Sequence, residues 1–278
     1  MDSFPLTSSD PIIQQAISYY RDNVDANGSF GGLSITSWVA ISLSAVGEDL
    51  ESWATTRFYL SNATATLNMS QATELERHTL ALISLQIDPQ NVSGINCVQH
   101  IIDLYHDGQI GDPAQIQDDI FGILSLRSAG VAKEHEIIQN VTQYIIEQQQ
   151  DNGSWGDADT TAAALMALNA SGKDKSSQVI KKAIKFIHNQ QSPSGGFTSW
   201  GSTNTATTSW VIMALTSQEI DIFSSEWMQQ DISSISYLLS MQHPNGSFYY
   251  TEHSHLHPTW MTAYALIAMT GNSFQVNP

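Results

Sequence analysis

A short turn motif returns along the chain, and this repetition restricts the fold more than any other feature of the sequence. The motif is Gln, three residues, Gly, one residue and an aromatic residue. It ends the segments 144–155, 186–197 and 237–248, and a fourth copy at 20–30 has Val24 in the Gln place. Gly readily adopts the left-handed backbone that ends a helix. The repetition therefore predicts a series of helix-turn-helix units.

A second helix, rich in small and apolar residues, is expected after each turn. Six such segments align on their last apolar residue, and apolar residues recur in them three and four positions apart. They are 34–43, 76–85, 117–126, 159–168, 206–215 and 260–269. No alternating run predicts a strand of any length.

Six units fill the 278 residues and leave no room for a second domain. We therefore expect an all-α chain that forms a single (α/α)6 toroid, with six inner and six outer helices, over residues 1–278. The predicted repeats are roughly 11–47, 53–85, 94–130, 134–172, 177–216 and 226–271.

Residues four and seven positions apart lie on the same face of a helix. In the six inner helices, one such face is polar at the helix start, aromatic in the middle and aliphatic further along. The first layer holds Ser34, Glu76, Gln117, Asp159, Ala206 and Trp260. The second layer holds Trp38, Leu80, Phe121, Ala163, Trp210 and Tyr264. We expect this face to line the lumen as an aromatic-walled pocket with acids at its mouth. The alternative is that these aromatic side chains simply fill the ring as core residues.

The charge of the chain excludes several classes of partner. Lys and Arg number 10 against 27 Asp and Glu, which gives a net charge of −17. Nucleic acids and anionic membranes are bound by clustered positive charge. A small hydrophobic ligand is the expected partner, and a homodimer or a cap protein could close the pocket. Only Arg77 lies near the predicted mouth, so a diphosphate substrate is disfavoured unless Mg²⁺ bridges the acids.

The sequence gives opposing indications of where the protein resides. No apolar run reaches the length of a membrane span, and the first residues lack the regions of a signal peptide, which predicts a soluble, cytoplasmic protein. An excess of Asn-X-Ser/Thr sites favours a secreted or cell-surface alternative. These sites are Asn27, Asn62, Asn68, Asn91, Asn140, Asn152, Asn169 and Asn245.

The repeated turns resemble the QW motifs of squalene-hopene cyclases and related class II terpene cyclases, in the prenyltransferase and squalene-cyclase repeat superfamily. The segment Gly156-Asp-Ala-Asp-Thr-Thr-Ala162 is similar to the Asp-x-Asp-Asp acid motif of these enzymes, in the Asp-x-Asp-Thr-Thr form that some of them carry. The resemblance implies proton-initiated cyclisation of a polyprenyl substrate, with Asp159 as the general acid. No cofactor would be required, and Mg²⁺ would be needed only for a diphosphate substrate.

Other residues are expected to support this chemistry. A carboxylic acid donates a proton near neutral pH only if burial or neighbouring carboxylates raise its pKa. The candidate neighbours of Asp159 are Asp157, Asp118 and Asp119. The candidate substrate-binding residues are Glu76 and the aromatic residues Trp38, Phe121, Trp210, Trp260 and Tyr264, whose ring faces can stabilise cations. The alternative role of Asp159 is a helix N-cap, and a helix N-terminus lowers rather than raises a carboxyl pKa.

Two features depart from the cyclase pattern. The third acidic position of the motif is Thr160. Typical cyclases also enclose the substrate between two or more helical domains, whereas a single toroid leaves its pocket open to water, which quenches a carbocation.

Other functions remain open on the sequence. Protein prenyltransferase β-subunits share the toroid, but their zinc site needs Asp, Cys and His, and the single Cys97 lies in an outer-helix segment. A metal held by His253, His255 and His257 is less favoured than a polar loop. The main alternative is a non-enzymatic toroid that binds a large hydrophobic or corrinoid ligand, because the segment that begins at Asp159 is also similar to the transcobalamin and intrinsic-factor toroid. No His stands directly before Asp157 to ligate cobalt.

Overall fold

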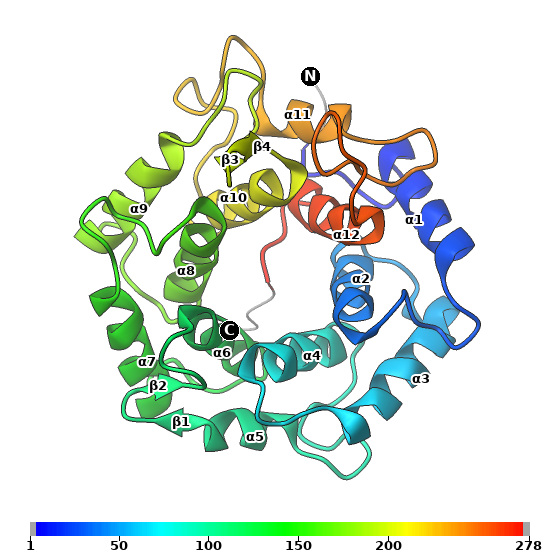
Figure 1. Cartoon of the computed structure of the whole chain (residues 1–278), viewed down its shortest axis with the longest axis vertical. Helices are drawn as coiled ribbons and strands as arrows, with labels where there is room; N and C mark the ends of the chain where they lie inside the picture. Colours follow the sequence, from blue (N-terminus) through cyan, green and yellow to red (C-terminus); the bar gives the residue numbers. More distant parts are fainter. Residues whose placement is uncertain (1–3, 275–278) are drawn as a thin grey trace.

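The computed structural model describes residues 4–274 and shows two concentric rings of helices (Figure 1). The inner ring consists of α2 (Leu33–Ala45), α4 (Ala72–Ser84), α6 (Ile116–Ser128), α8 (Ala158–Ala170), α10 (Thr205–Ser217) and α12 (Pro258–Met269). The outer ring consists of α1 (Pro11–Asn23), α3 (Ala54–Ala63), α5 (Cys97–Asp103), α7 (Glu136–Glu147), α9 (Gln178–His188) and α11 (Ser234–Ser240). The predicted all-α toroid is confirmed.

The inner ring is closed. Each inner helix packs on the next one, and α12 packs on α2. The predicted inner segments lie in the inner helices, except that Leu85 is the C-cap of α4. The helix α4 begins at Ala72, four residues before the predicted segment. Two hairpins of two-residue strands interrupt the helical pattern, namely β1 (Tyr105–His106) with β2 (Gln109–Ile110) and β3 (Thr198–Ser199) with β4 (Ser202–Thr203). Two 3-10 turns, η1 (Leu50–Trp53) and η2 (Thr64–Thr66), flank α3.

The Gln of the repeated turn connects consecutive units. Gln149 Nε2 donates to Gly153 O at 2.9 Å, within its own turn, and to Val179 O at 2.8 Å, in the outer helix of the next unit. Gln242 Nε2 makes the same pair of bonds, to Gly246 O at 3.1 Å and to Ile12 O at 2.9 Å. Because Ile12 belongs to α1, this second Gln joins the last unit to the first and helps to close the outer ring.

A Thr hydroxyl at the start of the inner helix holds the aromatic residue of each turn. The backbone N–H of the aromatic residue donates to this hydroxyl in all four copies of the motif. The pairs are Phe30 with Thr36, Trp155 with Thr161, Phe197 with Thr208 and Phe248 with Thr262, at 2.9 to 3.1 Å. All four aromatic side chains are buried. The turn thus fixes where these four inner helices begin, and therefore the level at which their residues face the lumen.

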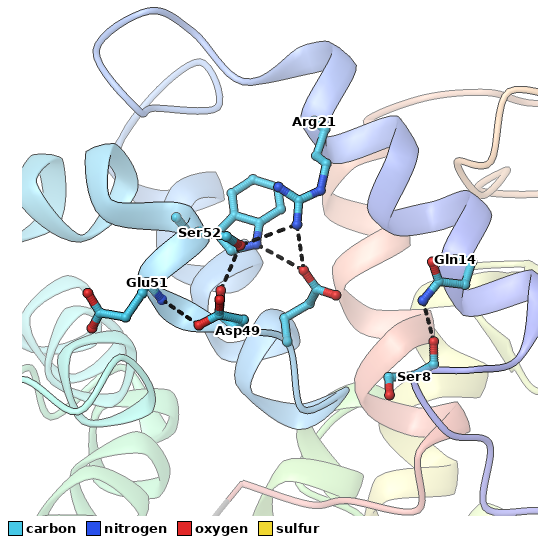
Figure 2. A network of polar contacts seen from close by, with 8 residues as sticks. Ser8, Gln14, Arg21, Asp49, Glu51 and Ser52 are labelled. Carbon is cyan, nitrogen blue, oxygen red and sulfur yellow. Dashed lines mark hydrogen bonds and ion pairs between the residues drawn. The ribbon is translucent and has the colours of Figure 1, made fainter.

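Polar contacts between α1 and η1 join the first two units on the outside of the ring (Figure 2). Arg21 Nη2 donates to Glu48 Oε2 at 2.9 Å and to Ser52 Oγ at 3.2 Å. The guanidinium carbon lies 4.7 Å from the centroid of the Trp53 ring. Asp49 caps η1 by accepting from the backbone N–H of Glu51 at 3.1 Å. Since Arg21 is about half exposed, we expect these contacts to orient the units more than to stabilise them.

None of the helices within residues 4–274 is long and apolar enough to cross a membrane.

Candidate functional site

A pocket of about 270 Å³ opens at the N-terminal ends of the inner helices. All six inner helices contribute to its lining. The lining residues are Trp38, Thr73, Arg77, Gln117, Phe121, Asp159, Thr160, Ala163, Ala206, Trp210, Trp260 and Tyr264. The polar and aromatic face that the sequence pattern assigned to the lumen therefore lines this pocket, and all five aromatic candidates are part of it.

The aromatic side chains meet at the centre of the ring. The Trp38 ring centroid lies 5.0 Å from that of Tyr264, 5.7 Å from that of Trp210 and 6.2 Å from that of Phe121. All three pairs are edge-to-face, the arrangement that the ring quadrupoles favour. The aromatic layer thus both fills the ring at this level and forms the floor of the pocket above it. The aromatic layer therefore acts both as the wall of a pocket and as core filling, the two roles that the sequence left open.

Asp159 lies in the first turn of α8 and lines the pocket. The N-cap of α8 is Asp157, whose Oδ1 accepts from the backbone N–H of Thr160 at 2.7 Å. The alternative role of Asp159 as the helix cap is therefore wrong, because Asp157 already fills it. Among the described residues, Asp159 Oδ1 has no hydrogen-bond partner. One carboxyl of the acid motif is thus structural, and the other faces the pocket.

The surroundings of Asp159 favour its protonated form. Burial raises the pKa of Asp159 to about 6, and the Asp157 carboxylate adds to the rise, while the nearby Thr207 hydroxyl opposes it. Neither Asp159 Oδ1 nor Thr207 Oγ1 has a hydrogen-bond partner of ordinary geometry within residues 4–274. Burial is the largest of these effects on the pKa of Asp159, and it outweighs the effect of the hydroxyl. A carboxyl with this pKa can hold and donate a proton in mildly acidic to neutral solution.

The two acids at the start of α6 do not line the pocket. Asp118 is held on both oxygens, because Oδ1 accepts from Thr73 N at 3.2 Å and Oδ2 accepts from Asp112 N at 2.9 Å. Asp119 Oδ1 accepts from the backbone N–H of Ile110 at 2.8 Å. Asp118 instead borders a neighbouring polar cavity of about 520 Å³. These carboxyls hold the start of α4 and the β2 hairpin in place, and Asp119 is fully buried.

Glu76, which we expected to touch the ligand, is fully buried and outside the pocket. Neither of its carboxyl oxygens has a hydrogen-bond partner within residues 4–274. Burial raises the pKa of Glu76 well above its usual value, and Asp118 and Asp119 raise it further. Burial likewise raises the pKa of Asp119 to about 7. Asp119 Oδ2 also lacks a hydrogen-bond partner in the described residues, so this group of acids is most stable when protons are bound to it.

We predict that Glu76→Gln stabilises the protein at neutral pH by about 1 to 3 kcal/mol, because it removes a buried group that ionises at a free-energy cost. An acid whose pKa rises on folding binds its proton more tightly in the folded state, so the free energy of unfolding falls as the pH rises above about 4. Thermal unfolding between pH 4 and pH 8 measures this. The gain should shrink toward pH 4. Glu74→Gln, at a partly exposed position of α4, is the control. A Tm for Glu76→Gln below that of the wild type at every pH between 4 and 8 would contradict the prediction.

Arg77, next to Glu76, is the one cationic side chain among the described residues that line the pocket. Its side chain also borders the polar cavity near Asp118. It takes part in none of the ion pairs found within residues 4–274, and its Nε has no hydrogen-bond partner there. Thr73, one helical turn earlier, is a pocket residue that the sequence analysis did not identify, because α4 begins before the segment we aligned. Together they give the mouth a polar side on α4, which is separated from Asp159's helix α8 by α6 alone.

The His-rich segment before α12 forms a polar loop. The rings of His243 and His255 stack with centroids 4.5 Å apart, and His255 Nε2 lies 2.8 Å from Ser247 Oγ. Within residues 4–274, no three His, Cys, Asp or Glu side chains are arranged to hold a metal ion. Cys97 is buried in α5, away from the pocket lining.

The sequence and the structure both have relatives among terpene cyclases. Residues 156–273 match the family model described as the squalene-hopene cyclase C-terminal domain. A variant of the type II terpene cyclase MstE from Scytonema, solved with its substrate geranylgeranyl dihydroxybenzoate, is 15% identical, with a TM-score of 0.68 over 94% of this chain and 96% of that chain. The ent-copalyl diphosphate synthase from Streptomyces platensis is 14% identical, with a TM-score of 0.63 over 86% of this chain and 50% of that longer chain.

The same ring also occurs in a different class of enzyme. A glycosidase variant is 8% identical, with a TM-score of 0.63 over 94% of this chain and 97% of that chain. No curated protein is similar to this sequence. At these identities, the structural likeness shows the fold and leaves the activity to the residues of the site. Residues 156–273 thus resemble the squalene-hopene cyclase C-terminal domain, and the described part of the chain has the α/α toroid fold seen in these type II terpene cyclases.

Proposed function

We propose that this protein is a class II terpene cyclase that cyclises a polyprenyl substrate, with Asp159 as the proton donor. The single observation that carries the proposal is the position of Asp159. Among the acids of the motif and its neighbours, it is the one whose carboxyl lines the aromatic pocket. It is free of the capping role, which Asp157 fills, and its pKa of about 6 keeps a proton available.

The reaction needs only the side chains of the pocket. The Asp159 proton adds to the less substituted carbon of the terminal alkene of the substrate, the π electrons of that alkene form the new C–H bond, and a tertiary cation results. A neighbouring alkene then attacks the resulting cation and closes a ring. The faces of Trp38, Phe121 and Trp210 stabilise the positive charge through their quadrupoles. Loss of a proton to a base or to water ends the sequence, so the product is an isomer of the substrate and no cofactor is consumed.

The size of a related cyclase supports a one-ring enzyme. This chain covers 96% of the MstE chain, which is a type II terpene cyclase. A second helical domain is therefore not a requirement for this class of enzyme. Like MstE, whose ligand is a geranylgeranyl dihydroxybenzoate, this chain would bind a prenyl chain, with its apolar part over the aromatic floor. Arg77 would contact a polar head group at the mouth.

Incubation with candidate substrates tests the proposal. Polyprenyl alcohols, prenylated benzoates, squalene and epoxysqualene are each mixed with the protein, and the extracts are analysed by mass spectrometry. Cyclic isomers of a substrate would support the cyclase.

The alternative function is a non-enzymatic toroid that binds a ligand. The pocket volume of about 270 Å³ lies below the roughly 300 to 1,000 Å³ of most ligand sites. For this alternative, the volume favours a small hydrophobic ligand over a corrinoid. Tight binding with no turnover of any substrate would support that alternative.

We predict that the rate of cyclisation falls as the pH rises. The reactive form of a general acid is the protonated form, and the pKa of Asp159 is about 6. The rate should be nearly constant below that pH and fall about tenfold per pH unit above it. Initial rates between pH 4.5 and pH 8.5 under saturating substrate measure this profile. A rate that increases through pH 6 would mean that Asp159 acts as a base and would contradict the proposed role.

A further inference from the structure

The chain that follows α12 turns back into the centre of the ring (Figure 1). Its last described residue, Phe274, is only 3% exposed. The Phe274 ring centroid lies 5.4 Å from that of Trp210, 5.6 Å from that of Trp38 and 6.3 Å from that of Phe121. These are three of the residues that form the pocket floor, and Phe274 does not line the pocket itself. Phe274 therefore packs against the aromatic floor from below.

The segment that carries Phe274 is held at both sides of its base. Asn272 Nδ2 donates to the backbone oxygen of Ala45, at the end of α2, at 2.8 Å, and to Thr270 Oγ1 at 3.1 Å. The N-terminal segment lies against the same base, because the backbone N–H of Leu6 donates to Met269 O at 2.9 Å. These contacts come from two different parts of the chain, and they fix the path of the segment into the lumen.

This segment divides the lower lumen into two spaces. On one side, a cavity of about 20 Å³ lies among Ile41, Leu80, Ile83 and Ile267, with room for about one water molecule. On the other side, a cavity of about 340 Å³ lies beside Met166, Asn169 and Thr216. Asn272, Ser273 and Phe274 border both cavities. Without the Phe274 ring, only the aromatic floor would separate the upper pocket from this lower space.

We propose that Phe274 is a specificity-determining residue that closes the lumen from below and limits how far a chain-like ligand can extend into it. The aromatic floor is made of side chains from separate helices, and rings of this kind can move apart only if the space beneath them is free. Phe274 occupies that space. The inference rests on the proposed function for the chain-like form of the natural ligand, but it concerns binding and not proton transfer.

Binding of straight-chain alcohols tests the inference without catalysis. Isothermal titration with a series from octanol to octadecanol gives the affinity as a function of chain length. Each buried methylene should tighten binding about fourfold until the chain reaches the closed floor. For the wild-type protein, we expect the affinity to stop rising within the series. For Phe274→Ala, we expect it to continue to rise, so that the longest alcohols bind at least about tenfold more tightly than to the wild type.

Three further variants keep the test decisive. Phe58→Ala removes a ring that is 68% exposed on α3 and should leave the chain-length limit unchanged. Phe274→Leu and Phe274→Trp retain apolar bulk, and they should move the limit to longer and shorter alcohols, respectively, even if Phe274→Ala does not fold. The same limit in every folded variant at position 274 would overturn the inference. If the cyclase proposal fails, the wild-type protein, which retains Asp159, forms no cyclic product. The chain length at which the affinity for alcohols stops rising would not change.

Discussion

Asp159→Asn is expected to lower the rate of cyclisation by about 100-fold to 10,000-fold, the range over which a positioned general acid contributes to catalysis. The amide of Asn has nearly the shape of the protonated carboxyl, but it cannot donate a proton to an alkene. Because Asp159 is partly buried and does not cap α8, the substitution should leave the fold intact. Single-turnover rates with excess enzyme, together with circular dichroism of both proteins, measure the effect.

The matched control is Asp157→Asn in the same motif. Asp157 accepts from the Thr160 N–H, and Asn is as good an N-cap as Asp. We therefore expect only a small change in both rate and stability for this variant. Cyclic products that form at the wild-type rate in Asp159→Asn would refute the assigned role. A large rate loss in Asp157→Asn, with the fold preserved, would instead move the proton donor to the capping position.

Gly246→Ala is expected to lower the free energy of unfolding by about 4 kcal/mol or more, at the extreme end of what single substitutions do. Gly246 has a φ of +91°, which is strained for any residue with a Cβ. A Cβ at this position would also lie 2.1 Å from the backbone oxygen of Gln15 in α1. That oxygen belongs to a helix and cannot move aside alone. The turn of the last unit would then separate from the first unit, at the place where Gln242 bonds to Ile12.

Gly130→Ala separates the two causes. Gly130 has a φ of +88°, almost the same as that of Gly246, but a Cβ there would meet no atom within 4 Å. Gly130→Ala should lower the free energy of unfolding by only about 1 to 2 kcal/mol, the contribution of backbone strain alone. Chemical denaturation of the two variants beside the wild type gives both values. Equal losses in the two variants would show that the close approach to α1 contributes nothing.

Much of the architecture could be read from local sequence rules. The turn motif predicted the turns between the helices, and its Gly positions do adopt the left-handed conformation. These Gly residues lie five to seven residues after the outer helix ends, so the expectation that they end the helix itself was wrong. The spacing of apolar residues predicted the inner helices, since a helix places residues three and four apart on one face. The alignment was weakest for α4. There, Arg77 rather than Glu76 lines the pocket, because the Glu76 carboxyl lies beside Gly122 of α6.

The candidate site depended more on long-range contacts. The motif around Asp159 was visible in the sequence, but both of its carboxyls could have capped α8. The hydrogen bond from Thr160 to Asp157 decided this, since a cap needs an extended backbone before the helix starts. Asp118 and Asp119 looked like partners of Asp159. In the structure, both oxygens of Asp118 accept hydrogen bonds, from Thr73 and Asp112, and Asp119 Oδ1 accepts one from Ile110. The positions of these donors depend on the packing of a hairpin and a neighbouring helix.

The sequence by itself determined the ring of helical repeats, the acid motif and the aromatic layer, because these follow from periodicity and from residue chemistry within each unit. Only the tertiary structure decided which acid faces the pocket, how the aromatic rings meet and what lies beneath them. Phe274 illustrates the reason. Nothing near it in the sequence marks it as part of the site, and its contacts with Trp38, Phe121 and Trp210 exist only because ring closure brings α2, α6 and α10 around the end of the chain.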